Sequence, residues 1–482
     1  MLNRFLLLGC TLLVALCLFA IPVSEGAPAI ALTGVMSGIA ILLFRKYTAE
    51  KEFITTVFLS GLVLRMGFGL LIHIFDLRAF FGGDALAYDV RGWSQVEVWL
   101  GLNTETATMI LLSNPESGAG SGMYYLTAVI YTIFGRNILA AQSFCAVIGA
   151  ATAPMIYYCA KKIFGNLKVA RFSALSIALF PSFVIWSGQL LKDGLIIFLL
   201  VASMTMVLQL QDKFSYAAIG FLVFSMIGIL SLRFYIFYMV FIAVVGSFII
   251  GVSKSNQSIF RRTVVLFIIG FGLMYLGVGR TAEVELRVFG NLERIQSSRS
   301  DLARAAGSGF NEETDVSTSE GALTAVPTGF MYLMLAPFPW QAENLRQSIT
   351  IPEVLAWWAM IPFGFLGLGY TIRYRLRNAF PVLIFSLLLS VAYSVLQGNV
   401  GTAYRQRTQI QVFLFIMIAV GWTVYQERRE NKRLKRSAAQ RHIDGQLRNY
   451  RSPKLSQPEV AASQEPELKL PEKIAERESD SK

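Results

Sequence analysis

The chain has 482 residues, of which 54% are hydrophobic and only 15% are charged, and its mean hydropathy is +0.53. A soluble globular protein has about 45–50% apolar and about 25% charged residues, so this composition excludes an ordinary soluble domain. In a soluble protein the net charge of +12 would suggest nucleic acid as a partner, but no basic–aromatic module accompanies it. We expect no nucleic acid partner, because an excess of Lys and Arg is typical of the cytoplasmic loops of membrane proteins.

Neither cysteine nor histidine points to a metal site or a disulfide. The two histidines, His73 and His442, lie far apart, and no cysteines have metal-ligand spacing. All four cysteines fall in apolar runs: Cys10, Cys17, Cys145 and Cys159. We therefore infer no disulfide and expect no metal site built on these residues.

Apolar runs of roughly 17–25 residues, the length of a membrane-crossing helix, recur along residues 1–425. They predict an all-α polytopic membrane domain with about twelve transmembrane helices. The expected spans are residues 3–23, 28–45, 53–76, 138–160, 172–188, 190–210, 215–231, 234–252, 263–279, 353–372, 378–397 and 408–425. The first run also has the basic start of a signal peptide within residues 1–27, but its length favours a span.

Lys and Arg collect in the connections on one side of the expected spans. These connections are residues 45–51, 161–171, 211–213, 253–262 and 373–377. By the positive-inside rule this side is the cytoplasm, and twelve spans place both termini there. The tail, residues 426–482, is basic near the membrane and mixed in composition beyond. We expect it to be disordered or weakly helical and to contact anionic lipid headgroups.

The opposite, outer side carries two large connections, residues 77–137 and 280–352, and a short turn at 397–407. Residues 122–135 are apolar but too short to span comfortably, and we expect a helix lying at the membrane interface. The aromatic, proline-containing stretch 327–345 is expected to be interfacial as well, or a re-entrant hairpin. Residues 283–320 are polar, which favours a mobile outer loop; a lid over a site is the alternative.

Two acids follow the third apolar run, within the stretch FFGGDALAYDVRGW at residues 80–93. A carboxylate at the hydrocarbon edge costs free energy unless it is paired or hydrated. On a helix, Asp84 and Tyr88 share a face, whereas Asp89 is rotated away. We therefore expect Asp84 to face a wet cavity as the working acid, with Asp89 paired to Arg91 or hydrated. Asp89 remains the alternative working acid, and Asp89 and Asp193 are the candidate secondary acids.

Further charged residues are expected at the same outer face. They are Arg78, Lys192, Asp193, Arg233, Arg405 and Arg407. The bases are nearly all arginine, whose planar donors suit phosphate. Arg405 and Arg407 diverge by about 200° on a helix, whereas in an extended turn both flank one phosphate. Arg65 lies in the middle of a span and needs a partner that the sequence does not identify.

Residues 77–200 resemble the membrane glycosyltransferases related to protein O-mannosyltransferases and aminoarabinose transferases, which have the fold called GT-C. The shared pattern begins with a Gly-Asp pair and a Tyr four residues later, here Asp84 and Tyr88. An interfacial helix ending in Phe-Gly follows, then a span closing on KKIFG (161–165). A span closing on LFPSFVIWSG (179–188) with an acid shortly after it, Asp193, completes the pattern.

The resemblance implies a multi-span glycosyltransferase with its active site on the outer face and Asp84 as general base. The implied donor is a polyprenyl-phosphate sugar, with Lys192, Arg405 and Arg407 as candidate phosphate ligands by their location. Asp193 corresponds to an acid with a structural or cavity-lining role; Tyr88, Arg78 and Arg233 are further candidates for lining the cavity. Many relatives carry an Asp-Glu pair where this chain has Asp84-Ala85. No cofactor is expected, and dependence on a divalent metal stays open.

Two other functions remain as alternatives. A polymerase or ligase of lipid-linked glycans shares this architecture and depends on the outer arginines rather than on Asp84. A lipid or polysaccharide transporter requires polar residues along several spans, where mainly Arg65 occurs. The expected acceptor is a lipid, a glycan or a protein, and the expected location is the bacterial inner membrane.

Overall fold

The computed structural model of the chain describes residues 2–81, 83–112, 121–250, 256–275, 277–278, 291–305, 309–310, 314–342 and 344–451. Throughout these residues the regular elements are helices, apart from one isolated antiparallel bridge between Gly309 and Asn399. Helices satisfy their own backbone hydrogen bonds, which a bilayer requires of any segment that crosses it. The architecture is that of an all-helical, multi-pass membrane protein.

Seven described helices are long and apolar enough to cross a membrane. They are α2 (Val23–Lys46), α3 (Lys51–Ile74), α8 (Ile138–Phe164), α11 (Lys192–Asp212), α18 (Leu345–Tyr374), α19 (Leu376–Leu396) and α20 (Val400–Arg451). An eighth span results if α9 (Leu167–Leu179) and α10 (Pro181–Ser187), which are bent by 54°, count as one. The break falls at Pro181, because proline lacks the backbone donor that would continue the helix.

The other predicted spans coincide with apolar helices that are shorter than the seven above. They are α1 (Leu2–Ala20), α12 (Tyr216–Leu232), α13 (Phe234–Ile250) and α14 (Asn256–Tyr275). Each of the twelve predicted ranges overlaps one of these helices, one of the seven longer ones or the bent pair. Residues 276 and 279 of the predicted span 263–279 lie outside the described residues.

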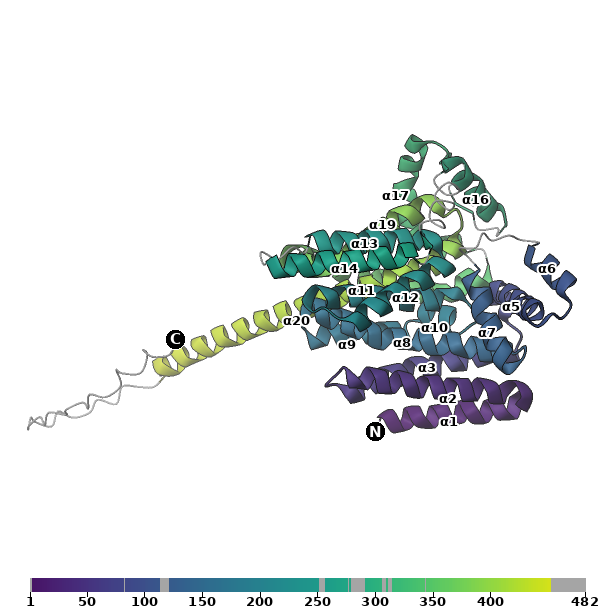
Figure 1. Cartoon of the computed structure of the whole chain (residues 1–482). Coiled ribbons are helices and arrows are strands. Elements are labelled where there is room, and N and C mark those ends of the chain that lie inside the picture. The colour runs from purple at the N-terminus through teal and green to yellow at the C-terminus, as the bar shows by residue number, and fades with distance from the viewer. Residues whose placement is uncertain are drawn as a thin grey trace, which may run out of the picture. The chain divides into compact units, whose positions relative to one another are not determined.

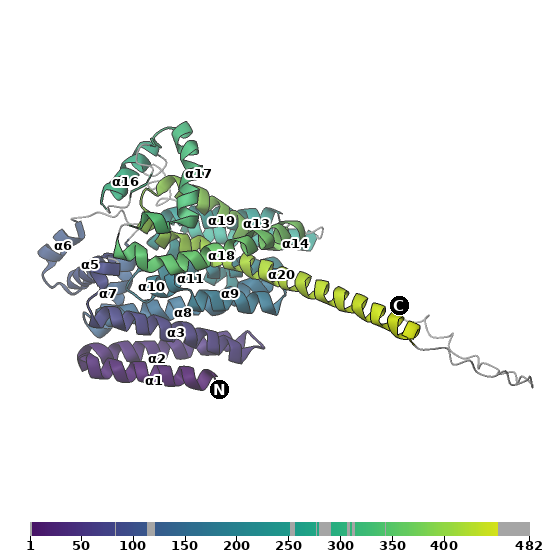
Figure 2. The same cartoon turned by 180° about the vertical axis from the view of Figure 1, so that it is seen from behind.

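The remaining helices gather at one end of the helical bundle, together with α7 (Gly122–Phe134) (Figures 1 and 2). They are α4 (Arg78–Phe81), α5 (Asp84–Leu100), α6 (Thr104–Leu112), α16 (Leu292–Ala305), α17 (Ser319–Leu335) and the 3-10 helix η1 (Pro339–Gln341). Helix α16 was not predicted, because residues 283–320 were expected to form a loop; residues 283–290 are not described. Along this helix Ile295, Arg299 and Ala303 are spaced four residues apart and therefore lie on one face, which is turned inward.

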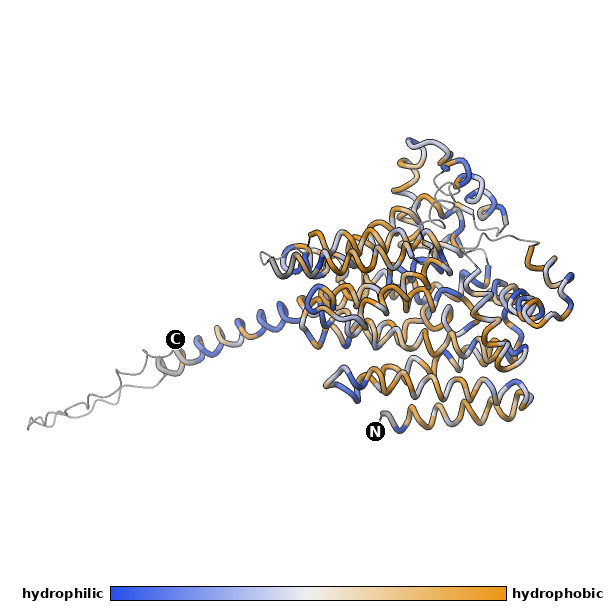
Figure 3. Tube along the Cα trace, viewed as in Figure 1, coloured by the Kyte–Doolittle hydropathy of each residue, from blue (hydrophilic) through white to orange (hydrophobic). Residues whose placement is uncertain are grey.

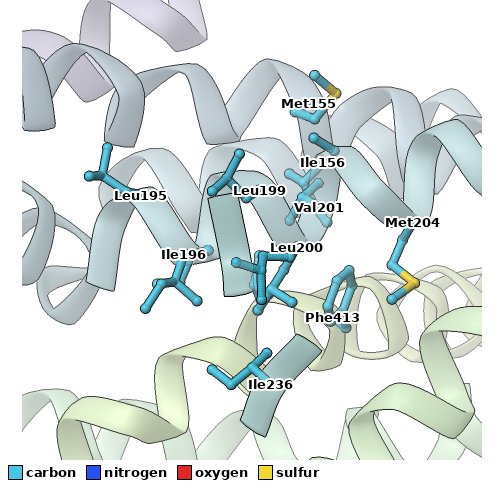
Figure 4. Packing of buried hydrophobic residues seen from close by; sticks show 14 of the residues in the cluster. Met155, Ile156, Leu195, Ile196, Leu199, Leu200, Val201, Met204, Ile236 and Phe413 are labelled. Atoms are coloured by element: carbon cyan, nitrogen blue, oxygen red, sulfur yellow. The ribbon is translucent and has the colours of Figure 1, made fainter. Parts of the chain in front are cut away.

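The helices of the membrane part lie side by side, with α1, α2 and α3 neighbouring one another and α8 packed against α2, α3, α9 and α11 (Figure 1). Hydrophobic residues predominate along this bundle, whereas polar residues concentrate at its ends (Figure 3). The core lies where α8, α11, α13 and α20 meet: Ile156, Leu200, Ile236 and Phe413 pack together there (Figure 4). This core fixes the ends of the same helices, which carry the candidate site.

Contacts divide the chain into two units, residues 1–426 and 427–482. Helix α20 runs from the first unit into the second and ends at Arg451, and residues 452–482 lie outside the described part. Residues 427–444 of the helix are exposed and rich in Lys and Arg. The beginning of the tail is thus helical, one of the two forms predicted for it.

Candidate functional site

Four charged residues meet where the ends of several helices converge. Asp84 is the first residue of α5, Asp193 is the second residue of α11, and Arg405 lies in the second turn of α20. Arg233 is the C-cap of α12. The dipole of a helix favours an anion at its N-terminus and a cation at its C-terminus. The two acids and Arg233 therefore occupy helix ends that suit their charges.

Arg405 bridges the two acids. Its Nε and Nη2 atoms lie 2.6 and 2.5 Å from Oδ2 of Asp193, and its Nη1 lies 2.6 Å from Oδ2 of Asp84. The Asp193 side chain is 0% exposed, whereas that of Asp84 is 49% exposed. One buried acid therefore fixes the guanidinium from the protein side, and one half-exposed acid meets it at the surface.

Arg233 gives Asp193 a second cation. Its Nη2 lies 3.5 Å from Oδ1 of Asp193, and its Nη1 donates to the Tyr393 hydroxyl at 3.5 Å. Tyr393 in turn donates to Oε1 of Gln409 at 2.7 Å. A buried carboxylate is strongly unfavourable without compensating charge and hydrogen bonds. Arg233 and Arg405 together provide that compensation for Asp193.

Two aromatic side chains complete the candidate site. The Arg405 guanidinium lies 5.6 Å from the ring centroid of Trp186, within cation–π range. Tyr88 is 4% exposed and lies within electrostatic reach of Asp84 and Arg405. Burial, and then the charge of Asp84, raise the pKa of Tyr88 above its ordinary value. Its phenol therefore stays protonated at neutral pH and is available as a hydrogen-bond donor.

Asp89 lies outside this cluster, where α5 contacts α7 and the segment after α7. Its Oδ1 accepts from the Tyr131 hydroxyl at 2.6 Å, and its Oδ2 lies 2.6 Å from Nη2 of Arg136. Asp89 therefore pairs with Arg136 and not with Arg91, so that part of the expectation is wrong. Arg91 instead donates to the hydroxyl of Tyr124 at 2.5 Å. Asp89 faces α7 because it is rotated away from Asp84 on the same helix.

Arg407 points away from the cluster that contains Arg405. Both residues lie in α20, so the alternative of an extended turn at 397–407 is wrong. Arg407 is 0% exposed, and its Nη1 donates to the backbone carbonyls of Met334 and Ala336 at 3.0 and 2.9 Å. Its role as a phosphate ligand stays a prediction that this placement does not favour.

The mid-span Arg65 has one partner on its own helix, Gly61, and its other partners at the broken span. Its Nε donates to Oγ of Ser187 at 2.7 Å, and its other nitrogens donate to the carbonyls of Gly61, Ala178 and Ile177 at 3.0–3.2 Å. The carbonyls at the end of α9 have no helical partner, because Pro181 stops the helix. Arg65 therefore stabilises a helix end inside the membrane part.

The two other basic candidates have different positions. Arg78 is buried beside His73 and lies 3.7 Å from Oδ1 of Asp76. Lys192 is the first residue of α11, directly before Asp193, and it contributes positive charge there. Lys192 therefore belongs to the candidate site, whereas contacts with His73 and Asp76 connect Arg78 to the end of α3.

Four residues near these arginines were not predicted. Trp186, Tyr393 and Gln409 lie in apolar runs, where the sequence carries no sign of their contacts. Glu353 accepts from the Tyr404 hydroxyl at 2.8 Å and is 7% exposed. An acid at the beginning of an apolar run is a signal that could have identified Glu353.

The arrangement combines two cations that are only 10% and 14% exposed, Arg233 and Arg405, with one accessible acid. The two negative and two positive charges balance among Asp84, Asp193, Arg233 and Arg405. The contact between Asp84 and Arg405 lies at the exposed edge of this cluster. An incoming anion can therefore replace Asp84 as a partner of Arg405. The Asp84 carboxylate is then able to accept a proton. Within the described residues, no group of three or more His, Cys, Asp or Glu side chains is placed to hold a metal ion. No protein-family model matches the chain, and no curated protein matches it.

Proposed function

We propose that the chain is an integral-membrane glycosyltransferase that moves a sugar from a polyprenyl-phosphate donor to an acceptor hydroxyl at the outer membrane face. The observation that supports this proposal is the bridge from Asp193 through Arg405 to Asp84. It combines a fixed cation suited to phosphate with an accessible carboxylate. The resemblance of residues 77–200 to membrane glycosyltransferases supports the same function.

The proposed reaction uses these groups in one displacement. The acceptor oxygen attacks the anomeric carbon, the bond from that carbon to the phosphate oxygen breaks, and the acceptor proton passes to Asp84. Arg405, with Arg233 and Lys192 near it, stabilises the negative charge that develops on the leaving polyprenyl phosphate. When the donor binds, Arg405 would exchange its contact with Asp84 for a contact with the donor phosphate. The Asp84 carboxylate would then be released. General base catalysis of this kind contributes about 10²–10⁴-fold.

We further propose twelve spans, with both termini in the cytoplasm and the candidate site on the periplasmic side of a bacterial inner membrane. Contacts among the Lys- and Arg-rich connections support a common cytoplasmic end. Lys162 lies 2.9 Å from Asp212, and Arg171 Nε lies 3.0 Å from Glu50. The basic residues after 426 would then face anionic cytoplasmic lipid headgroups.

The experiment compares Asp84→Asn, Asp84→Glu and Arg405→Ala in proteoliposomes that contain a labelled polyprenyl-phosphate sugar and candidate acceptors. Formation of a glycosidic bond and release of polyprenyl phosphate are measured together. We expect Asp84→Asn to lower the transfer rate by about 10²–10⁴-fold, because an amide cannot accept the proton. Asp84→Glu keeps the carboxylate and should retain part of the activity. Arg405→Ala should lower both donor binding and turnover.

The two alternatives predict different outcomes. Full activity in Asp84→Asn with none in Arg405→Ala would favour a polymerase or ligase that depends on the arginines. Movement of a labelled lipid or glycan across sealed vesicles, without a new glycosidic bond, would favour a transporter. The structural partners of Arg65 weaken the transporter alternative, because the mid-span cation stabilises a helix break.

A further inference from the structure

A cavity of about 230 Å³ lies among α1, α2, α3 and α8, and Gly188, in the segment between α10 and α11, forms part of its wall. Its wall is almost wholly apolar and includes Leu13, Leu59, Leu62, Leu70 and Ala146. No step of the proposed sugar transfer uses it. Its position beside the broken span nevertheless connects it to residues that support the site.

Two buried hydroxyls also line the cavity. Ser37 and Ser143 are 8% and 1% exposed, and among the described residues their Oγ atoms have no hydrogen-bond partner. The guanidinium-bearing Arg65 and the backbone of Gly188 form part of the same wall. A well-packed core avoids both empty volume and unpartnered polar atoms. The combination indicates a space that holds a ligand in the membrane.

The surroundings determine which ligands reach this space. Helices α1 and α2 present large apolar side chains outward: Leu12 is 61%, Val35 is 63% and Leu42 is 72% exposed. Only 11% of the apolar window of α2 is buried within the protein. In a bilayer these helices contact lipid hydrocarbon, which is therefore the material next to the cavity.

The wall and its surroundings select one kind of ligand. The residues that line the cavity extend from Ala29 to Ser37 on α2 and from Leu59 to Leu70 on α3, which at 1.5 Å per residue makes the cavity about 12–16 Å long. An almost wholly apolar space of this length beside lipid hydrocarbon suits a segment of a lipid acyl chain.

We propose that the cavity is a structural lipid site that holds one acyl chain of a bilayer phospholipid. The chain fills the apolar space and packs against Arg65, which donates to Ser187 at 2.7 Å. Ser187 lies six residues before Asp193, so the bound chain supports the turn that positions the buried acid. This site does not depend on the proposed glycosyl transfer, since it is defined by the cavity alone.

Two glycines of α2 provide a matched test. Gly34 lines the cavity and Gly38 does not, and a Cβ added at either one meets nothing within 4 Å. The substitution Gly34→Leu should fill the cavity, whereas Gly38→Leu adds the same side chain outside it. The full chain is purified and placed in vesicles of phosphatidylethanolamine and phosphatidylglycerol that contain a phospholipid with a diazirine in one acyl chain. Photolysis followed by peptide mass spectrometry locates the attached lipid.

We expect wild type and Gly38→Leu to carry the lipid on cavity-lining residues, and Gly34→Leu to lose about tenfold of this labelling. Ser37→Leu enlarges another side chain in the cavity wall and provides the same test if Gly34→Leu does not fold. Equal labelling of the cavity in wild type and in a folded filled variant would overturn the proposal. Preferential labelling by a diazirine polyprenyl phosphate, in competition with the phospholipid, would overturn it as well. Both results are independent of whether the chain transfers a sugar.

Discussion

Arg405 and Asp193 are 212 residues apart in sequence, yet Nε of the arginine lies 2.6 Å from Oδ2 of the aspartate. Asp193 is fully buried, and the same arginine reaches the half-exposed Asp84 with Nη1. A guanidinium is planar and carries donors in a fixed geometry, so one acid can orient it for a second partner. The contact joins α20 to α11, so the position of Arg405 depends on how these helices pack.

The substitution Asp193→Ala should be the most destabilising change in the candidate site. It leaves Arg405 and Arg233 buried without their shared carboxylate, and removal of one partner of a buried ion pair costs about 3–5 kcal/mol. Unfolding by sodium dodecyl sulfate in mixed micelles, followed by circular dichroism, measures the loss. Asp84→Ala is the control, because that side chain is half exposed. Equal stability of the two variants would contradict the structural role of Asp193.

Arg405→Lys should keep the charge and lose the bridge. A lysine ammonium is a point charge and cannot contact two carboxylates in the planar geometry of arginine. If the chain is the glycosyltransferase proposed above, the folded variant should transfer sugar at least about 10²-fold more slowly, since the cation would no longer meet the donor phosphate at a fixed position. Steady-state rates at saturating donor measure the effect. Wild-type turnover in Arg405→Lys would show that only the charge matters.

Arg407→Met should act through stability rather than donor binding. The methionine keeps much of the volume but leaves the carbonyl of Ala336 without its donor, at about 1–3 kcal/mol for an unpaired buried group, whereas the Met334 carbonyl keeps Trp357 Nε1 as a donor at 2.8 Å. The free energy of unfolding and the KM for the donor are measured on the same preparation. A raised KM with unchanged stability would instead support Arg407 as a phosphate ligand.

Glu50 should make the stability of the chain depend on pH in the acid range. Hydrogen bonding from Arg171 is the largest influence and lowers the pKa of Glu50 below 4.5, against the opposing effect of burial. The Tyr157 hydroxyl also donates to this carboxylate, at 2.8 Å. Because the pKa is lowered by folding, the stabilisation is fully present above about pH 4.5 and is lost as the pH falls through the folded-state pKa.

The variant Glu50→Gln isolates this contribution. Thermal unfolding is measured from pH 7 to pH 3 for the variant and the wild type. We expect the wild type to be more stable at pH 7 and the difference to shrink below about pH 4.5. A difference that stays constant over the whole range would exclude the ionisation of Glu50 as the source of the pH dependence.

The crossing of α18 and α20 should tolerate no added methyl group at its contact. A Cβ on Gly367 would lie 1.8 Å from the carbonyl oxygen of Met417, and one on Gly421 would lie 1.8 Å from that of Phe363. Small residues allow such close approach of membrane helices. Gly367→Ala and Gly421→Ala should each lower the melting temperature, whereas Gly369→Ala, with nothing within 4 Å, should not. Three equal melting temperatures would contradict this packing.

The sequence by itself determined that the protein is helical and belongs in a membrane. The apolar runs are long enough to cross a bilayer, and a bilayer admits only segments that satisfy their own backbone groups. Helical geometry also separated Asp84, which shares a face with Tyr88, from Asp89. These predictions rest on local periodicity, which each segment carries alone.

Only the tertiary structure decided which charges meet. Arg405 and Arg407 are two residues apart, and their different partners follow from the direction of α20 against its neighbours. Arg65 finds its carbonyl partners because another span breaks at Pro181 beside it. Contacts between residues more than a hundred positions apart depend on how helices pack, and helix packing is a property of several segments together. No single stretch of sequence contains that information.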